Sequence, residues 1–309
     1  EQYWDIDHSI FTARKMDSEA KDYYDNDRIV KRRFEVDWKR TSAKPRFRKF
    51  IMDSDDGGDF GLEEELEEVR VALERNYAVI CRAFSFFCVT GNAVGEGAYS
   101  MPLNQWTSFL FDCEIPDKES QFCKTSDLDT MFIVTNYESD KKSEESKVND
   151  DKAFMRFEFL EAIVRVAVCK FGRGQATSDC SESVDMLATN CVAPCLCPEA
   201  VLEPNEFRRE RMYCRDVAAV FENNERILLS LFDFYKAPGR EELMGMEHWY
   251  RFLEKSGVLG AKTGISKREV KLIFMWSQMS VSDEIKKRGK LVGATFVDFL
   301  ECLGRTADL

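Results

Sequence analysis

An internal duplication constrains this 309-residue chain more than any other feature. Residues 69–88 align with residues 217–236, and apolar side chains fill matching positions at helical spacing. Three further blocks follow in the same order, and their matching pairs include Trp106 with Trp249, Leu128 with Val270, and Phe159 with Phe299. The offset between the copies drifts only from 148 in the first block to 140 in the last. The chain therefore contains two copies of one helical unit.

The helical spacing of the apolar residues predicts an all-α fold. The predicted helices lie at 63–88, 103–113, 126–136 and 156–171 in the first copy, and at 206–236, 246–255, 266–279 and 295–305 in the second. Thr125 or Ser126 is an N-cap signal, as is Ser266 with Glu269 three residues later. We expect two four-helix lobes, at 61–172 and 205–309. The segment 173–204 is predicted to be a linker with one helix near 181–191.

The N-terminal residues 1–60 lack a clear apolar period and are expected to form an extended basic arm. The net charge of the whole chain is −12, yet residues 28–49 hold ten basic side chains against two acidic ones. The basic residues are Arg28, Lys31, Arg32, Arg33, Lys39, Arg40, Lys44, Arg46, Arg48 and Lys49. A basic arm on an acidic body predicts binding to an acidic partner. The alternative is that these residues form ion pairs within the molecule or lie on a solvated face.

Several functional classes find no support in the sequence. No apolar run approaches the ~20 residues of a membrane span. The two histidines, His8 and His248, do not accompany a recognisable nucleophile, and the phosphate-binding pattern GxxxxGK[ST] is missing, so we predict no catalytic residues and no cofactor. The eleven cysteines are scattered, which fits a reducing cytoplasmic compartment. The cysteine cluster at 191–197 lacks the paired spacing of a zinc site.

Two short motifs occur at the same place in both copies. They are Phe157-Glu158-Phe159-Leu160 and Val297-Asp298-Phe299-Leu300, each a carboxylate followed by an apolar pair. They resemble the loop end and exiting helix of an EF-hand, and Leu103–Trp106 and Met246–Trp249 occupy the same place in the odd-numbered hands. The resemblance to the EF-hand superfamily covers about 65–308. It implies two lobes, each a pair of helix–loop–helix units, and apolar grooves that take amphipathic helices.

A narrower resemblance comes from three phrases in the two copies and one before them. These are residues 132–136, 154–167 and 277–284, with Asp37-Trp38-Lys39-Arg40. They are similar to calmodulin-like modules of axonemal, microtubule-associated proteins in ciliated and flagellated protists. This resemblance implies a place in the axoneme of a cilium or flagellum, with tubulin or axonemal subunits as partners.

The calcium loops depart from the EF-hand pattern, which has 12 residues with oxygen ligands at positions 1, 3 and 5, Gly at 6 and Glu at 12. The four loops here span 18, 23, 13 and 21 residues. The second loop keeps the best candidate ligands, which are Asn136, Glu138, Asp140 and Glu158, but Lys141 replaces the Gly. Calcium binding is therefore expected to be absent or weak.

A non-enzymatic structural or adaptor protein is the leading hypothesis for this chain. A calcium-sensing regulatory protein is one alternative, and calcium titration would separate the two. Nucleic-acid binding through the basic arm is another, which the acidic body disfavours.

Overall fold

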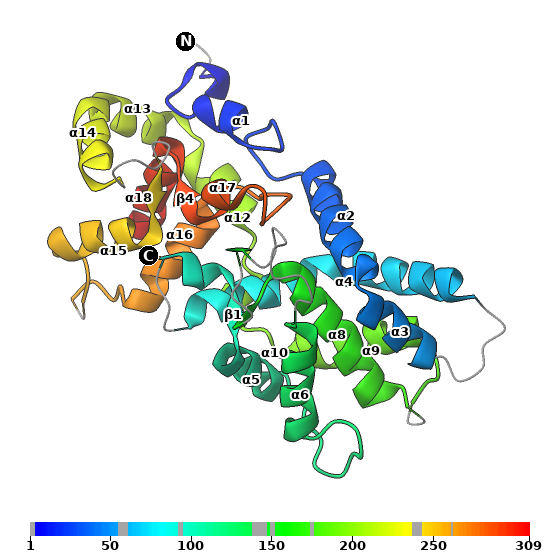
Figure 1. The fold of residues 1–309 in the computed structure, drawn as a ribbon. Helices are drawn as coiled ribbons and strands as arrows, with labels where there is room; N and C mark the ends of the chain where they lie inside the picture. The colour runs from blue at the N-terminus through cyan, green and yellow to red at the C-terminus, as the bar shows by residue number, and fades with distance from the viewer. Residues whose placement is uncertain are drawn as a thin grey trace. The chain divides into compact units, whose positions relative to one another are not determined.

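The computed structural model describes residues 4–54, 61–91, 95–137, 147–148, 152–173, 176–236, 243–260 and 262–309. Most of this part of the chain is helical, as the sequence predicts (Figure 1). It divides into two compact units. The first-repeat unit comprises Arg33–Gly91 and Ser100–Val201, and the second-repeat unit comprises Glu1–Arg32, Asn92–Tyr99 and Leu202–Leu309. Among the described residues, no helix combines the length and the apolarity needed to cross a membrane.

The first-repeat unit is built around a long helix, α4. Its elements are α2 (Asp27–Ala43, with the residues from Arg33 onward in this unit), α3 (Pro45–Ser54), α4 (Leu62–Thr90), β1 (Met101–Pro102), α5 (Leu103–Asp112), α6 (Thr125–Thr135), β2 (Ala153–Phe154), α8 (Arg156–Phe171), α9 (Cys180–Leu187), the π-helical turn η3 (Ala188–Val192), α10 (Ala193–Cys195) and α11 (Pro198–Val201). Strands β1 and β2 form a two-residue antiparallel ladder. Helix α9 packs along both α4 and α8 (Figure 1).

The second-repeat unit follows the same order in its repeated part, except that its first helix is divided into two and a short helix, α17, precedes its second strand. Its elements are η1 (Ile6–His8), α1 (Ala13–Asp17), η2 (Gly95–Tyr99), α12 (Pro204–Phe207), the π-helical turn η4 (Arg208–Met212), α13 (Arg215–Asn223), α14 (Glu225–Tyr235), β3 (Met244–Gly245), α15 (Met246–Lys255), α16 (Lys267–Ser277), α17 (Arg288–Val292), β4 (Gly293–Ala294) and α18 (Phe296–Asp308). Strands β3 and β4 again form a two-residue antiparallel ladder. In both units a short ladder therefore joins the two loops, and a helix begins directly after each strand or one residue later.

The helices predicted from the spacing of the apolar residues agree closely with those of the structure. Helices α4, α5, α6, α8, α15, α16 and α18 each begin and end within three residues of their predicted bounds. Ser266 caps α16 as predicted, because its hydroxyl accepts the N–H of Arg268. The N-cap of α6, in contrast, is Lys124, and Thr125 is already helical. The predicted helix at 206–236 is divided among α12, η4, α13 and α14.

Each unit has a tryptophan at the centre of its core. Trp106 and Trp249 are completely buried, and their indole nitrogens donate to Leu128 O at 3.3 Å and to Val270 O at 3.2 Å. Their rings meet the matching phenylalanines edge-on, with centroids 6.1 Å apart for Trp106–Phe159 and 6.0 Å apart for Trp249–Phe299. The predicted equivalence of the two tryptophans is confirmed.

The expectation of an extended N-terminal arm at 1–60 is wrong for the described part of that segment. Phe11 is fully buried in the second-repeat core, and Phe34, Phe47 and Ile51 are buried in the first-repeat core. Helices α2 and α3 carry these apolar residues on one face and most of the basic residues elsewhere. The expected linker at 173–204 also differs, since α9 and η3 contribute buried side chains to the first-repeat core.

Deleting residues 1–60 is therefore expected to unfold both units rather than leave them intact. The deletion removes Phe11 from one core and Phe34, Phe47 and Ile51 from the other, and each large buried side chain contributes several kcal/mol. Circular dichroism and hydrogen exchange of the 61–309 fragment would measure the loss. The matched control is the full chain with the exposed Lys31 changed to Glu, which should fold normally. A fragment with the parent's unfolding midpoint would contradict this expectation.

Candidate functional site

The loop-end carboxylates are the first candidate site, because the sequence placed Glu158 there as a calcium ligand. Glu158 is the third residue of α8, and Asp298 is the third residue of α18. Each carboxylate accepts the backbone N–H of the residue before its helix, at 2.8 Å from Met155 and at 2.7 Å from Thr295. Both side chains are buried. By accepting this N–H, each carboxylate caps the N-terminus of its helix.

A lysine from the N-terminal segment faces the carboxylate in the first-repeat unit. The Nζ of Lys44 lies 3.7 Å from Glu158 Oε1 and 3.3 Å from Glu161 Oε2. It also donates to the carbonyl oxygen of Thr135, the last residue of α6, at 3.2 Å. The ammonium group thus connects the end of the incoming helix α6 to the start of the exiting helix α8.

An arginine from the N-terminal segment makes the matching contacts in the second-repeat unit. Arg14 Nη1 pairs with Asp298 and donates to the carbonyl oxygen of Ser277, the last residue of α16, at 3.2 Å. Arg14 Nη2 lies 2.7 Å from Glu301 Oε2. Asp298 and Glu301 match Glu158 and Glu161 at the same offset of 140. Each unit therefore places a cation of its own between an incoming and an exiting helix.

Glu301 is the centre of a larger buried ion cluster. Arg208 Nε lies 3.0 Å from its Oε2, and Arg305 Nη2 lies 2.7 Å from its Oε1, in addition to the contact with Arg14. Arg14, Arg208, Glu301 and Arg305 are all buried. Burial works to raise the pKa of Glu301, but Arg208, Arg14 and Arg305 outweigh it and hold the pKa below its ordinary value.

The first-repeat unit has a second buried ion pair that the sequence did not indicate. Asp37 of α2 accepts from Arg156 Nε at 2.5 Å and Nη2 at 2.9 Å, and from the Tyr77 hydroxyl at 2.5 Å. Burial raises the pKa of Tyr77 well above its ordinary value, and the smaller lowering effect of Arg156 does not offset it. These contacts fix α2 against α4 and α8, which is a structural role.

The four calcium candidates can be compared with this arrangement only in part. Glu138 and Asp140 lie outside the described residues. Asn136 is buried directly after α6. Glu158 accepts the N–H of Met155 and forms an ion pair with Lys44. Within the described ranges, no group of three or more His, Cys, Asp or Glu side chains is arranged to hold a metal ion.

The ten basic residues proposed for partner binding fall into two groups. Exposed positions hold Arg28, Lys31, Arg32, Lys39, Arg46 and Lys49. Half-buried positions hold Arg33, Arg40, Lys44 and Arg48. Lys44 faces the carboxylates described above, and Arg48 pairs with Glu63. Intramolecular pairing therefore accounts for part of the cluster, and binding of an acidic partner by the exposed group stays a prediction.

A surface that the sequence did not indicate lies on α13 and α14. Three apolar side chains are exposed there, Val220 at 61%, Ile227 at 60% and Phe234 at 79%. The same positions of the first repeat are Ala72, Val79 and Phe86, which are buried or half-buried. The duplication itself could have suggested this comparison, but burial at those positions cannot be read from the sequence.

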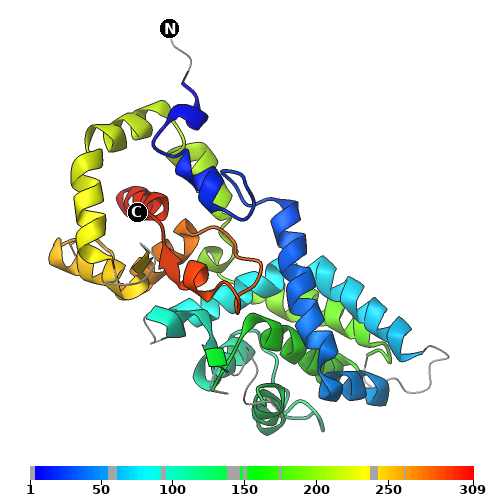
Figure 2. The ribbon, with the colours of Figure 1, turned by 45° about the horizontal axis from the view of Figure 1, so that its top comes forward.

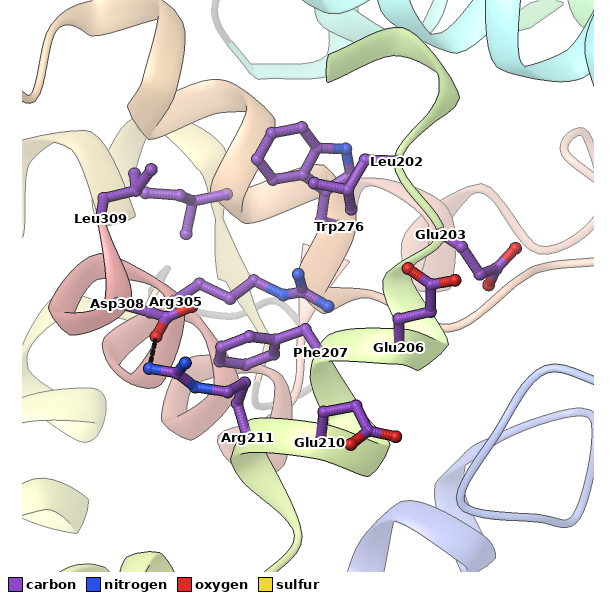
Figure 3. A pocket seen from close by; sticks show the side chains of 11 residues that line it. Leu202, Glu203, Glu206, Phe207, Glu210, Arg211, Trp276, Arg305, Asp308 and Leu309 are labelled. Atoms are coloured by element: carbon purple, nitrogen blue, oxygen red, sulfur yellow. Dashed lines mark ion pairs between the residues drawn. The ribbon is translucent and has the colours of Figure 1, made fainter. Parts of the chain in front are cut away.

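A pocket of about 340 Å³ lies among α12, η4, α16 and α18 of the second-repeat unit (Figure 3). Trp276 and Phe207 form aromatic walls, and the Arg305 guanidinium lies 4.3 Å from the Phe207 ring centre. Glu206 and Glu210 stand at one side, and the Arg211–Asp308 ion pair stands at the other. The pocket combines apolar walls with a partly acidic rim.

Comparison with known proteins adds no identification: no protein-family model, curated protein or solved structure matches this chain.

Proposed function

We propose that this chain is a non-enzymatic structural or adaptor protein built from two degenerate EF-hand pairs that stay folded without calcium. The observation that carries the proposal is the pair of built-in cations, Lys44 and Arg14. Each faces the loop-end carboxylate and the carboxylate one turn later, and each binds the last carbonyl of the incoming helix.

The EF-hand assignment is supported by the arrangement of the loops. Each unit pairs two helix–loop–helix segments through a short antiparallel ladder, β1 with β2 and β3 with β4. The exiting helices α5 and α15 begin directly after their strands, and α8 and α18 begin one residue later. This is the helix, loop, strand-like residue and helix order on which the sequence resemblance rests.

Calcium independence follows from electrostatics. A carboxylate in a low-dielectric interior needs a counter-charge, and in a working EF-hand the calcium ion supplies it. Here Lys44 and Arg14 supply it from the chain itself. A calcium ion would have to displace a tethered cation and order a loop longer than 12 residues, and both steps oppose binding. Static lobes of this kind suit a scaffold better than a calcium switch.

The partners and the location are proposed from the sequence resemblance. Amphipathic helices are the partners that such lobes take, and the exposed basic residues, among them Arg28, Lys31 and Lys39, suit an acidic protein surface such as tubulin. The axoneme of a cilium or flagellum is the proposed place of action.

Isothermal titration calorimetry with CaCl₂ tests the proposal. We expect no saturable site tighter than about 0.1 mM. Lys44→Gln should lower the stability of the first-repeat unit by about 1–2 kcal/mol, with or without calcium, because the ammonium no longer faces the buried Glu158 and Glu161, of which Glu161 keeps Arg165. The matched control is Lys31→Gln, which changes an exposed lysine. A micromolar site in the parent chain that disappears in Glu158→Gln would favour the calcium-sensing alternative.

A further inference from the structure

We infer that the exposed face of α13 and α14 is the docking site for an amphipathic helix of a partner protein, and that this helix carries the apolar and acidic pattern of the chain's own α9. The inference rests on the proposed adaptor function, because it names the surface and the kind of partner that such a protein would use.

The first repeat shows what covers this face. Helix α9 packs along α4, where Asp185 accepts from Asn76 Nδ2 at 2.6 Å and pairs with Arg75 Nη1 at 2.5 Å. On the same face of α4, Ala72 and Ala83 are buried almost completely. An amphipathic helix of the chain itself thus occupies this surface in the first-repeat unit.

The second repeat leaves the matching surface open. The positions that correspond to Ala72 and Ala83 hold Val220, which is 61% exposed, and Leu231, which is half-buried. Ile227 and Phe234, seven residues apart on α14, expose more than half of their side chains. The matching positions of the first repeat are buried or half-buried, so the exposure here leaves apolar surface for a docked helix to cover.

One of the two groups that bind Asp185 in the first repeat has a matching residue beside these exposed side chains. Asn224 corresponds to Asn76, and both side-chain amides donate to the backbone carbonyl four residues earlier, at 2.8 Å and 2.9 Å. Asn223, Asn224, Arg226, Ile227 and Ser230 line a shallow hollow of about 370 Å³. Asn223 stands at the position of Arg75, and the exposed Arg226, three residues later, supplies a positive charge beside Asn224. An acidic side chain on the docking helix would therefore find a donor and a cation.

The shape of the surface differs between the repeats in one respect. Helix α4 is continuous, whereas the second repeat is interrupted at Asn224, which separates α13 from α14. Figure 2 shows the two helices running in different directions, in yellow-green and yellow. The docking helix is therefore expected to lie mainly along α14, with its acidic residue near Asn224.

The pattern of α9 defines the chemistry of the partner. The buried residues Cys180, Val184, Leu187 and Cys191 recur every three or four positions along α9 and η3, so they form one apolar stripe. Asp179 caps the helix, since its carboxylate accepts the N–H of Ser181 at 2.6 Å. A partner helix with small and medium apolar residues at this spacing and a flanking acidic residue would fit the open face.

A fluorescein-labelled peptide with the sequence of residues 178–193 is the probe for this site. We would titrate it with the full-length chain in EDTA and follow its fluorescence anisotropy. The double variant Ile227→Glu, Phe234→Glu should weaken binding by at least about tenfold, because it places charges where the apolar stripe docks. The matched control is Ile133→Glu on α6, which changes another residue that is 67% exposed and should alter binding less than about twofold.

A charge exchange tests the orientation of the docked helix. The protein variant Arg226→Glu should bind the parent peptide more weakly than the parent protein does. The peptide variant Asp185→Lys should bind the Arg226→Glu protein better than the parent peptide does. Three results would overturn the inference: lack of saturable binding up to about 1 mM, binding that the α14 changes leave unaltered, or self-association of the chain that Phe234→Glu abolishes. Because EDTA is present throughout, failure here would leave the calorimetric test of calcium independence standing.

Discussion

Glu301→Gln is expected to destabilise the second-repeat unit by about 3–5 kcal/mol, the cost of breaking a buried ion pair by removing one partner. The variant keeps the size of the side chain but removes the carboxylate that Arg14, Arg208 and Arg305 share, and of these three Arg14 keeps its ion pair with Asp298. All three guanidinium groups are buried, so water cannot replace the lost contacts without opening the core.

Glu161→Gln is the matched control, because Glu161 occupies the same place in the first repeat. It pairs with Arg165 and with Lys44, whose side chain is 21% exposed and therefore stays partly hydrated. We expect a smaller loss, of about 1–2 kcal/mol. Hydrogen exchange along α8 and α18 would assign each loss to its unit. Equal losses in the two variants would show that the additional arginine of the second repeat has no energetic role.

The same carboxylate gives the second-repeat unit a dependence on pH. Since the folded-state pKa of Glu301 lies below its ordinary value of about 4.3, its contribution to stability is fully present above that value and is lost as the pH falls through the folded pKa. Unfolding midpoints measured between neutral and acidic pH should therefore fall more steeply in the parent chain than in Glu301→Gln. Parallel curves would indicate that other carboxylates control the acid transition.

The repeated helices were predictable because local sequence determines them. An apolar period at 3.6 residues and a capping box such as Ser266 with Glu269 need no knowledge of distant contacts. The helix expected near 181–191 corresponds to α9 and η3. The interruption at Asn224 was not, since Asn76 stands at the same position within the continuous helix α4. Local propensity therefore does not decide this feature by itself.

In the N-terminal segment the many charged residues obscure the apolar residues that indicate a packed helix. Phe47 and Ile51 lie four residues apart on α3, as a helix with one buried face requires, and Phe34 and Trp38 do the same on α2. The many lysines and arginines between them are typical of a solvated arm. Long basic side chains are compatible with a packed amphipathic helix, because their aliphatic stems can lie along its surface.

The built-in cations could not have been found from the sequence. Lys44 and Arg14 are far along the chain from the carboxylates they meet, and Arg14 lies outside the basic cluster. Nothing in the residues around Arg14 distinguishes it from an exposed arginine. Only the packing of α1 on α18 brings Arg14 to Asp298 and Glu301.

Trp249→Ala is expected to destabilise the second-repeat unit by about 3–5 kcal/mol, the usual cost of truncating a large core aromatic. The indole is fully buried, stacks on Phe252 with ring centres 5.6 Å apart, and meets Phe299 edge-on. Its Nε1 also donates to Val270 O, the link between α15 and α16. The truncation leaves a cavity and removes this hydrogen bond, while Val270 O, as a residue within α16, keeps its place in the backbone ladder of the helix, so the cavity is the larger cost.

Chemical denaturation followed by circular dichroism would measure this loss, and two further variants separate its causes. Trp249→Phe removes the hydrogen bond but keeps much of the ring volume, so it should cost less than Trp249→Ala. Phe234→Ala truncates an aromatic side chain that is 79% exposed and should stay within about 0.5 kcal/mol of the parent chain. A loss below about 1 kcal/mol for Trp249→Ala would mean that the second-repeat core is not organised around this tryptophan. Because Trp106 makes the same contacts in the first repeat, Trp106→Ala should instead destabilise that unit by a similar amount.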